Sequence, residues 1–206
     1  MTGLRERQKA DRHRRILAAA MARFRRDGFH AARIEDLAMD AEVSIGTVYN
    51  YYGTKGDLLM AAVALEVEEV LAGGEAILSN PPAGVAEALL SLIGHYYDHS
   101  LYYLTKGMWR AAMALSIEAP STPEGRRYTE LDARLAAQVT GLVSRLQARG
   151  IVEPTLDAQA LGEVLFNNLN AMFIEFVKDD GMTTDALKAR LAVQIGPLAR
   201  LMEPRQ

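Results

Sequence analysis

Small, hydroxyl and amide side chains between positions 44 and 50 are the residues of this chain best suited to recognising another molecule. Ser44 is a good N-cap residue, so a helix that begins after it runs through this segment. With about 100° between successive residues, Ile45, Val48 and Tyr52 fall on one side of that helix. The other side carries a polar stripe, which is formed by Gly46, Thr47, Tyr49 and Asn50.

This polar stripe cannot form a core, but its chemistry matches the edges of DNA bases. An asparagine amide can pair with adenine through two hydrogen bonds, and a threonine methyl can touch the thymine methyl. A short helix precedes the stripe, with apolar residues at i, i+3, i+4 and i+7: Ile34, Leu37, Ala38 and Ala41. Two short helices joined by a tight turn form a helix-turn-helix, whose second helix fits the major groove.

The charge of the N-terminal segment favours contact with a polyanion. Through residue 33 the chain has ten Lys and Arg against three Asp and Glu, whereas the whole chain carries −3. A basic end on an acidic body suits a protein that holds nucleic acid with one part. Two alternatives stay open: the basic end is a solvated, frayed terminus, or the three helices only pack together, with Tyr49, Tyr51 and Tyr52 as core aromatics.

Residues 34–58 resemble the TetR (tetracycline-repressor) family, whose helix-turn-helix commonly reads A-x-V-S-x-G-T-x-Y-x-Y-F, followed by x-x-K-x-x-L. The resemblance is strong over residues 15–60, and the matching residues are Ala41, Val43, Ser44, Gly46, Thr47, Tyr49, Tyr51, Tyr52, Lys55 and Leu58. It implies DNA contacts from Ser44, Ile45, Gly46, Thr47, Tyr49, Asn50 and Tyr51. Lys55 matches a position that grips phosphate at the start of the fourth helix, where backbone amides would assist it.

Two residues depart from the family pattern. Arg33 stands at the N-cap of the second helix, where the family usually has Thr or Ser, and Arg cannot act as an acceptor there. We expect it to contact phosphate instead, and we count it among the DNA-binding candidates. Glu42 replaces the usual turn glycine, which strains the backbone if this residue is left-handed.

Helical periodicity dominates the rest of the chain. Thr54 and Asp57 form a variant capping box that starts a long helix, which is expected to run toward the Gly73-Gly74 pair. Further helices are predicted at 83–99, 101–117, 126–149 and 157–179, and a last one is capped by Thr183 or Thr184.

With the resemblance, these elements predict an all-α fold of about nine helices. Residues 1–55 are expected to form a three-helix helix-turn-helix DNA-binding domain with a basic N-terminal arm. Residues 56–206 are expected to form a larger helical domain for effector binding and dimerisation.

The resemblance implies a homodimer in which the last two long helices pair across a two-fold axis. Candidate interface residues repeat at helical spacing on these two helices: Leu161, Leu165, Leu169, Phe173, Leu187, Leu191, Ile195 and Leu198. The alternative is that both stripes simply complete the core of a single chain.

Residues 92–117 are rich in aromatic residues and methionine, which line adaptable apolar pockets and also fill ordinary cores. The candidates for an effector pocket, three of them from the facing helix, are Tyr96, Tyr103, Met108, Trp109, Met113, Phe166, Asn167 and Asn170. His95 and His99 lie at i and i+4 and could share a zinc ion. No third ligand is evident, so we favour a pocket rim or surface role and expect neither metal nor cofactor.

The sequence therefore predicts a cytoplasmic DNA-binding regulator. The resemblance implies a repressor, released from a palindromic operator of double-stranded DNA by a small apolar or aromatic effector. The alternatives are a regulator without small-molecule control and a helical enzyme. The sequence lacks phosphate-binding loops, dinucleotide-binding, nucleophile-elbow and zinc-protease motifs, and it lacks cysteine, so we expect no enzyme. No apolar run approaches the ~18 residues that span a bilayer, and we expect no signal peptide.

Overall fold

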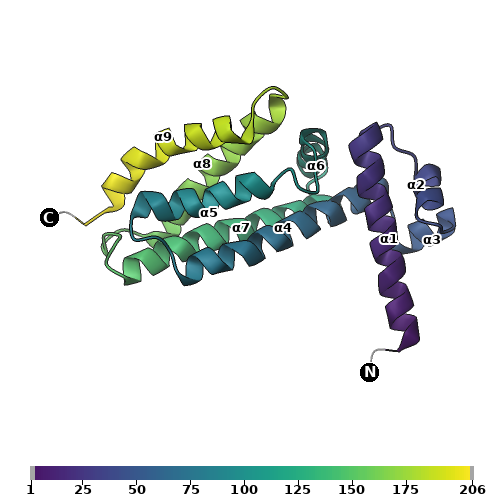
Figure 1. Ribbon diagram of the computed structural model, residues 1–206, viewed down its shortest axis with the longest axis horizontal. Helices are drawn as coiled ribbons and strands as arrows, with labels where there is room; N and C mark the ends of the chain where they lie inside the picture. Colours follow the sequence, from purple (N-terminus) through teal and green to yellow (C-terminus); the bar gives the residue numbers. More distant parts are fainter. Residues whose placement is uncertain (1–2, 205–206) are drawn as a thin grey trace. The chain divides into compact units, whose positions relative to one another are not determined.

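The protein is all-α over residues 3–204, which are the residues that this computed structural model describes (Figure 1). Nine helices and no strand occur in this range: α1 (Leu4–Asp27), α2 (Ile34–Asp40), α3 (Ile45–Tyr51), α4 (Lys55–Ser79), α5 (Val85–His99), α6 (Lys106–Glu118), α7 (Pro123–Ala148), α8 (Ala158–Lys178) and α9 (Thr184–Met202). The predicted fold class is therefore confirmed.

The chain divides into two compact units. The first contains the residues up to Leu65 together with 102–129, and the second contains 66–101 and the residues from 130 onward. The first unit thus joins the three N-terminal helices to α6 and to the beginnings of α4 and α7. These units are defined by packing, so the functional boundary between residues 55 and 56 stays a prediction.

The core of the first unit forms on one stripe of α1. Ile16, Ala20 and Phe24 are almost completely buried on that stripe, and so are Leu37 of α2 and Val48 of α3. Burial of these apolar side chains stabilises the three-helix arrangement, because each of the helices α2 and α3 is too short to persist alone.

Local signals end and start the helices much as the sequence predicts. Gly28 closes α1 with φ +82°, and the ring of Phe29 folds back onto Phe24 at a centroid distance of 5.3 Å. Thr183 caps α9 by accepting a hydrogen bond from the Ala186 amide at 3.1 Å. The predicted helix at 101–117 begins late, at Lys106, because Thr105 accepts the Met108 amide and so acts as the N-cap.

The prediction that α4 ends near Gly73 and Gly74 is wrong, since the helix continues to Ser79. Both glycines lie inside the helix at places where neighbouring side chains come close. A Cβ at Gly73 would collide with the His95 ring of α5, and a Cβ at Gly74 would collide with the Gln138 amide of α7. The glycines therefore make room for packing between helices, and their helix-ending tendency is overridden.

The predicted dimer stripes lie largely inside the single chain. Leu187, Leu191 and Ile195 of α9 are 1 % exposed and pack on the α5 side, where Lys188 also pairs with Asp98 at 2.6 Å. Leu165 and Leu169 of α8 are also buried, whereas Leu161, Phe173 and Leu198 are half-buried. Five of the eight candidates thus fill the core of the single chain, which leaves less of their surface for a second copy, and the interface assignment stays a prediction.

On the last two helices, the large apolar side chains that reach the surface lie at other positions. Val164 of α8 is 57 % exposed, and Val193 and Leu201 of α9 are 75 % and 76 % exposed. No described helix is both long and apolar enough to cross a membrane.

Candidate nucleic-acid interface

Helix α3 presents the predicted polar stripe to solvent. Gly46 and Asn50 are exposed, Tyr49 is 51 % exposed and Thr47 is half-buried. On the inner side, Val48 and Tyr52 are buried. A short helix with one buried and one open side can insert its open side into a groove without losing its core.

Ile45 differs from the prediction made from helical angles. It was expected on the side of Val48, but it is 42 % exposed, because it is the first residue of α3 and lies beyond the edge of the core. Ile45 is therefore open to solvent, like the residues of the polar stripe. An apolar side chain at this place suits contact with a thymine methyl.

Ser44 fixes the beginning of α3. Its Oγ accepts a hydrogen bond from the Thr47 amide at 3.1 Å and lies 2.8 Å from the Thr47 Oγ1. Glu42, two residues before Ser44 in the turn, has φ +53°. The left-handed conformation for which the family usually has glycine is therefore adopted here by a glutamate. This conformation costs free energy for a residue with a Cβ.

Two tyrosines attach the end of α3 to α1. The Tyr52 hydroxyl lies 2.8 Å from His13 Nε2, and burial raises the pKa of Tyr52 to about 12. Tyr51 is half-buried, and its hydroxyl donates to the backbone oxygen of Lys9 at 3.3 Å. Tyr51 was expected at the DNA, but the structure places its hydroxyl on α1 and not in the polar stripe.

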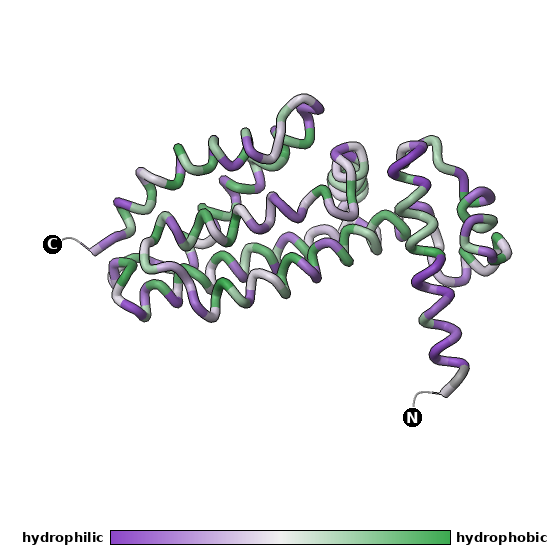
Figure 2. Tube along the Cα trace, viewed as in Figure 1, coloured by the Kyte–Doolittle hydropathy of each residue, from purple (hydrophilic) through white to green (hydrophobic). Residues whose placement is uncertain are grey.

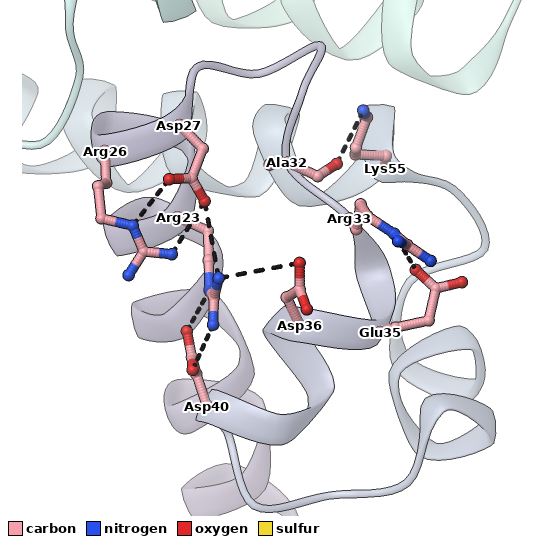
Figure 3. Close-up of polar contacts among 9 residues, drawn as sticks. All are labelled: Arg23, Arg26, Asp27, Ala32, Arg33, Glu35, Asp36, Asp40 and Lys55. Carbon is pink, nitrogen blue, oxygen red and sulfur yellow. Dashed lines mark hydrogen bonds and ion pairs between the residues drawn. The ribbon is translucent and has the colours of Figure 1, made fainter.

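Lys55 is also placed differently from its expected role in gripping phosphate. Its ammonium donates to the backbone oxygen of Ala32 at 3.1 Å (Figure 3). It also donates to the backbone oxygen of His30 at 2.9 Å and lies 4.9 Å from the centre of the Phe29 ring. These contacts satisfy the charge within the protein. Lys55 therefore ties the start of α4 to the loop between α1 and α2.

Arg33 remains at the surface. It provides no side-chain cap to α2, and its guanidinium lies 3.5 Å from Glu35 with 71 % of the side chain exposed. An exposed ion pair of this kind is weak, so the guanidinium remains available to a phosphate.

An ion-pair network on α1 and α2, which the sequence reasoning did not find, holds the helix-turn-helix in place (Figure 3). Arg23 donates to Asp40 at 2.7 Å and also lies near Asp36 and Asp27. The hydrogen bond from Arg23 lowers the pKa of the Asp40 carboxyl, and the hydrogen bond from Arg26 lowers the pKa of Asp27. The sequence contains the basic residue Arg23 and the acids Asp36 and Asp40, but they are 13 and 17 residues apart. Helical periodicity does not predict contacts between residues on different helices at such a separation.

The effector candidates fall into both compact units. Tyr103, Met108, Trp109 and Met113 belong to the first unit, and Tyr96, Phe166, Asn167 and Asn170 belong to the second. Tyr96, Met108, Trp109 and Phe166 are buried, whereas Tyr103, Met113 and Asn170 are half-buried. Asn167 is exposed in the single chain, so it is the least enclosed of the candidates.

Several polar groups near these candidates make contacts within the protein. The Tyr96 hydroxyl donates to Gln138 Oε1 at 2.8 Å, and burial raises the pKa of Tyr96 above its ordinary range. His99 Nδ1 lies 2.6 Å from the buried carboxylate of Glu66, and His95 Nε2 lies 3.0 Å from the Val70 oxygen. The described residues contain no group of three potential metal ligands.

Asp132 of α7 is a partly buried carboxyl that sequence reasoning missed. It makes no hydrogen bond or ion pair with any residue that the structure describes, and burial raises its pKa to about 6. A carboxyl without a partner is costly, and such groups are often found at ligand sites.

Comparisons with known proteins agree with this arrangement. Residues 16–62 match the family model described as bacterial regulatory proteins, tetR family. The chain is 30 % identical to the HTH-type transcriptional repressor KstR of Rhodococcus jostii over 191 residues, which cover 90 % of this chain and 82 % of that protein.

Solved structures show the same fold. A TetR-family regulator from Pectobacterium atrosepticum has a TM-score of 0.75 at 19 % identity and covers 98 % of both chains. FadR from Bacillus subtilis in complex with stearoyl-CoA has a TM-score of 0.63 at 20 % identity and covers 90 % of this chain and 96 % of that one. From the helix-turn-helix geometry, the matching segment and the near full-length relative, the chain belongs to the TetR family and is a DNA-binding transcriptional regulator rather than an enzyme.

Proposed function

We propose that the chain is a homodimeric repressor that binds a palindromic operator through α3 and leaves it when a small apolar or aromatic effector binds. The observation that carries the proposal is the open polar stripe of α3, with Tyr49 51 % exposed beside a completely buried inner side. The name of the Rhodococcus jostii relative, a repressor, supports repression over activation. A role on the chromosome also supports a cytoplasmic location.

The DNA-binding residues within this proposal are those that combine exposure with suitable chemistry. Ile45, Gly46, Thr47, Tyr49 and Asn50 supply base contacts, with Ser44 at the helix start and Arg33 on the backbone. Tyr51 and Lys55 act indirectly, because their polar atoms are bonded within the protein. They hold α3 and the loop before α2 in position.

A palindromic operator requires two copies of α3 related by a two-fold axis. We infer that the exposed apolar residues of α8 and α9, which are Val164, Val193 and Leu201, contribute to the dimer interface. Apolar side chains with more than half of their area in solvent are costly, and burial against a second copy removes that cost.

An effector of apolar character is supported by the aromatic and methionine content around α5 and α6 and by the solved relative that holds stearoyl-CoA. The effector releases DNA only if it binds more tightly to the conformation that cannot bind the operator. Regulation without a small molecule is the second candidate, and a ligand screen separates the two.

The test of DNA recognition uses Thr47→Ala and Tyr49→Ala in the full chain. Each removes a contact from the polar stripe, so each is expected to weaken binding to the operator by roughly 1–3 kcal/mol while the chain stays folded. Affinity is measured at fixed salt on a duplex selected from random sequences with the wild-type protein. Tyr102→Ala, at another exposed tyrosine (65 %), is the control. Unchanged affinity in both stripe variants contradicts the assigned face.

A further inference from the structure

The N-terminal part of α1 extends as a helix past the three-helix core. We call residues 4–15 the helical arm. Residues 5–10 are all exposed, and Figure 1 shows this end of α1 projecting beyond α2 and α3. Figure 2 shows the same stretch as mostly hydrophilic. At 1.5 Å per residue the arm is roughly 18 Å long, about half a turn of B-DNA.

The arm is fixed beside the recognition helix. The Tyr51 hydroxyl at the end of α3 donates to the Lys9 backbone oxygen at 3.3 Å, and the His13 ring stacks on Tyr52 at a centroid distance of 5.2 Å. Arg15 pairs with Glu42, in the turn before α3, at 3.3 Å. The course of the arm is therefore tied to both ends of the element that is proposed to enter the major groove.

The cations of the arm differ in whether the protein neutralises them. Arg14 and Arg15 are both paired with Asp11. Four others form no ion pair or side-chain hydrogen bond with any described residue: Arg5, Arg7, Lys9 and Arg12. These four charges are exposed and free to bind an external anion.

Three of the four free cations lie on one side of α1. Arg5, Lys9 and Arg12 have the spacing i, i+4 and i+7, and Ile16 continues the same stripe at i+11. Since Ile16 is completely buried in the three-helix core, the stripe lies on the side of α1 that faces α2 and α3. Arg7 lies about 180° from Ile16, on the opposite side.

We propose that the helical arm is a second DNA contact, in which Arg5, Lys9 and Arg12 bind backbone phosphates that flank the site of α3. This inference rests on the proposed function. A row of unpaired cations beside a recognition helix complements the phosphate backbone, which carries one charge per about 1.7 Å of duplex. The occupant is therefore the same duplex that α3 binds.

The helical form of the arm determines which part of the duplex it contacts. An α-helix with its side chains is about 10–12 Å wide, whereas the minor groove is about 6 Å wide, so the arm cannot enter that groove. The neighbouring major groove is occupied by α3 in this arrangement. The arm thus binds phosphates without reading bases, and it raises affinity for all sequences alike.

The test compares two double variants of the full-length chain with equal loss of charge. Lys9→Gln/Arg12→Gln removes two cations from the inner stripe, and Arg7→Gln/Arg14→Gln removes two from the other side of the same arm. Glutamine keeps helix propensity close to that of Lys and Arg, and circular dichroism with thermal melting verifies folding. Binding is measured over a salt series on the selected operator and on an unrelated duplex of equal length.

For Lys9→Gln/Arg12→Gln, the negative slope of log K against log salt is expected to become shallower by roughly 3–4, because a dimer loses four phosphate contacts at about 0.9 each. Affinity is expected to fall by about tenfold or more on both duplexes, with their affinity ratio unchanged. The control variant is expected to keep a slope near that of the wild type.

Equal losses in the two double variants, or an unchanged slope in the inner-stripe variant, overturn the arm contact. A loss confined to the operator also overturns it, since that result indicates base reading. If the wild-type chain shows no preference for any duplex, the proposed function itself fails. That outcome is distinct, because a failed arm contact leaves specific binding by the wild type intact.

Discussion

At the scale of single residues, the structure separates side chains that are open to solvent on α3 from side chains that hold this helix and its neighbours in place. Thr47 and Tyr49 lie on the open side of α3, while Lys55 and Tyr51 direct their polar atoms to backbone oxygens of the loop before α2 and of α1. In a family whose motif contains all four residues, a substitution at each is expected to have a different effect. Loss of a stripe residue affects binding, and loss of a holding residue also affects stability.

Sequence reasoning succeeded where the controlling interactions are local. The 100° rule placed Val48 and Tyr52 inward, and Ser44 is the N-cap that its residue type predicted. It did not find the contacts of Lys55, because the oxygens that bind its ammonium belong to residues 23 and 25 positions earlier. No spacing in the sequence announces a hydrogen bond to a distant backbone group.

Asp132 provides a residue-scale prediction about pH. Its folded-state pKa of about 6 lies above its ordinary value of 3.8, so the folded state holds this proton more tightly. The associated stability is present below about pH 4 and is lost as the pH rises through about 6. Asp132→Asn removes the ionisable group. We therefore expect the free energy of unfolding of the variant, relative to that of the wild type, to increase as the pH rises, by on the order of 1–2 kcal/mol above pH 7.

Urea unfolding of both chains at about pH 4.5 and about pH 7.5 measures this difference. Glu87→Gln, at an exposed acid of α5, is the control for the removal of one carboxyl group. A stability difference between Asp132→Asn and the wild type that stays constant across this range contradicts the burial argument.

At the scale of helices, the last two elements show why a stripe of leucines does not identify an interface. Leu187, Leu191 and Ile195 have the spacing of a pairing helix, but α5 covers them within the chain. Val193 and Leu201 lie on the open part of the same helix. Periodicity reveals that a helix has an apolar side, and only the tertiary structure reveals what that side packs against.

Val193→Glu tests the revised dimer surface. A charge placed at a residue that is 75 % exposed leaves the fold of one chain intact but is costly if a second copy covers it. We expect the variant to be monomeric in sedimentation experiments and to bind the operator at least about tenfold more weakly, since each subunit then binds one half-site alone.

The matched control is Ile117→Glu on α6, where the side chain is 77 % exposed and lies outside α8 and α9. It should remain a dimer with unchanged DNA affinity. A dimeric Val193→Glu variant would show that pairing uses another surface.

At the scale of the whole molecule, the proposed homodimer would place two copies of α3 on two half-sites on one side of the duplex. Hydroxyl-radical footprinting on the DNA that flanks the chain's own gene is expected to show two protected half-sites. Their centres should lie about 34–36 Å apart, or a multiple of that spacing. Protection of a single asymmetric site would contradict two-fold recognition.

Effector control is a second expectation at this scale. In a panel that includes stearoyl-CoA, steroids and aromatic acids, we expect one class to raise the melting temperature and to release the operator. A ligand present at 100 times its Kd stabilises the fold by about 2.7 kcal/mol. Trp109→Ala removes a large buried side chain and is expected to weaken the binding of that ligand. Unchanged affinity would show that Trp109 does not line the pocket.

The attachment of the helical arm has a consequence for how such a regulator can change. Tyr51 bonds to the main-chain oxygen of Lys9, and every amino acid offers that same oxygen. That contact therefore does not depend on the side chain at position 9, whereas His13 and Arg15 attach the arm through their side chains. If the arm binds DNA as proposed, the charges at Arg5, Lys9 and Arg12 can be added, removed or inverted one at a time. The strength of DNA binding can then be adjusted without altering the residues that choose the sequence.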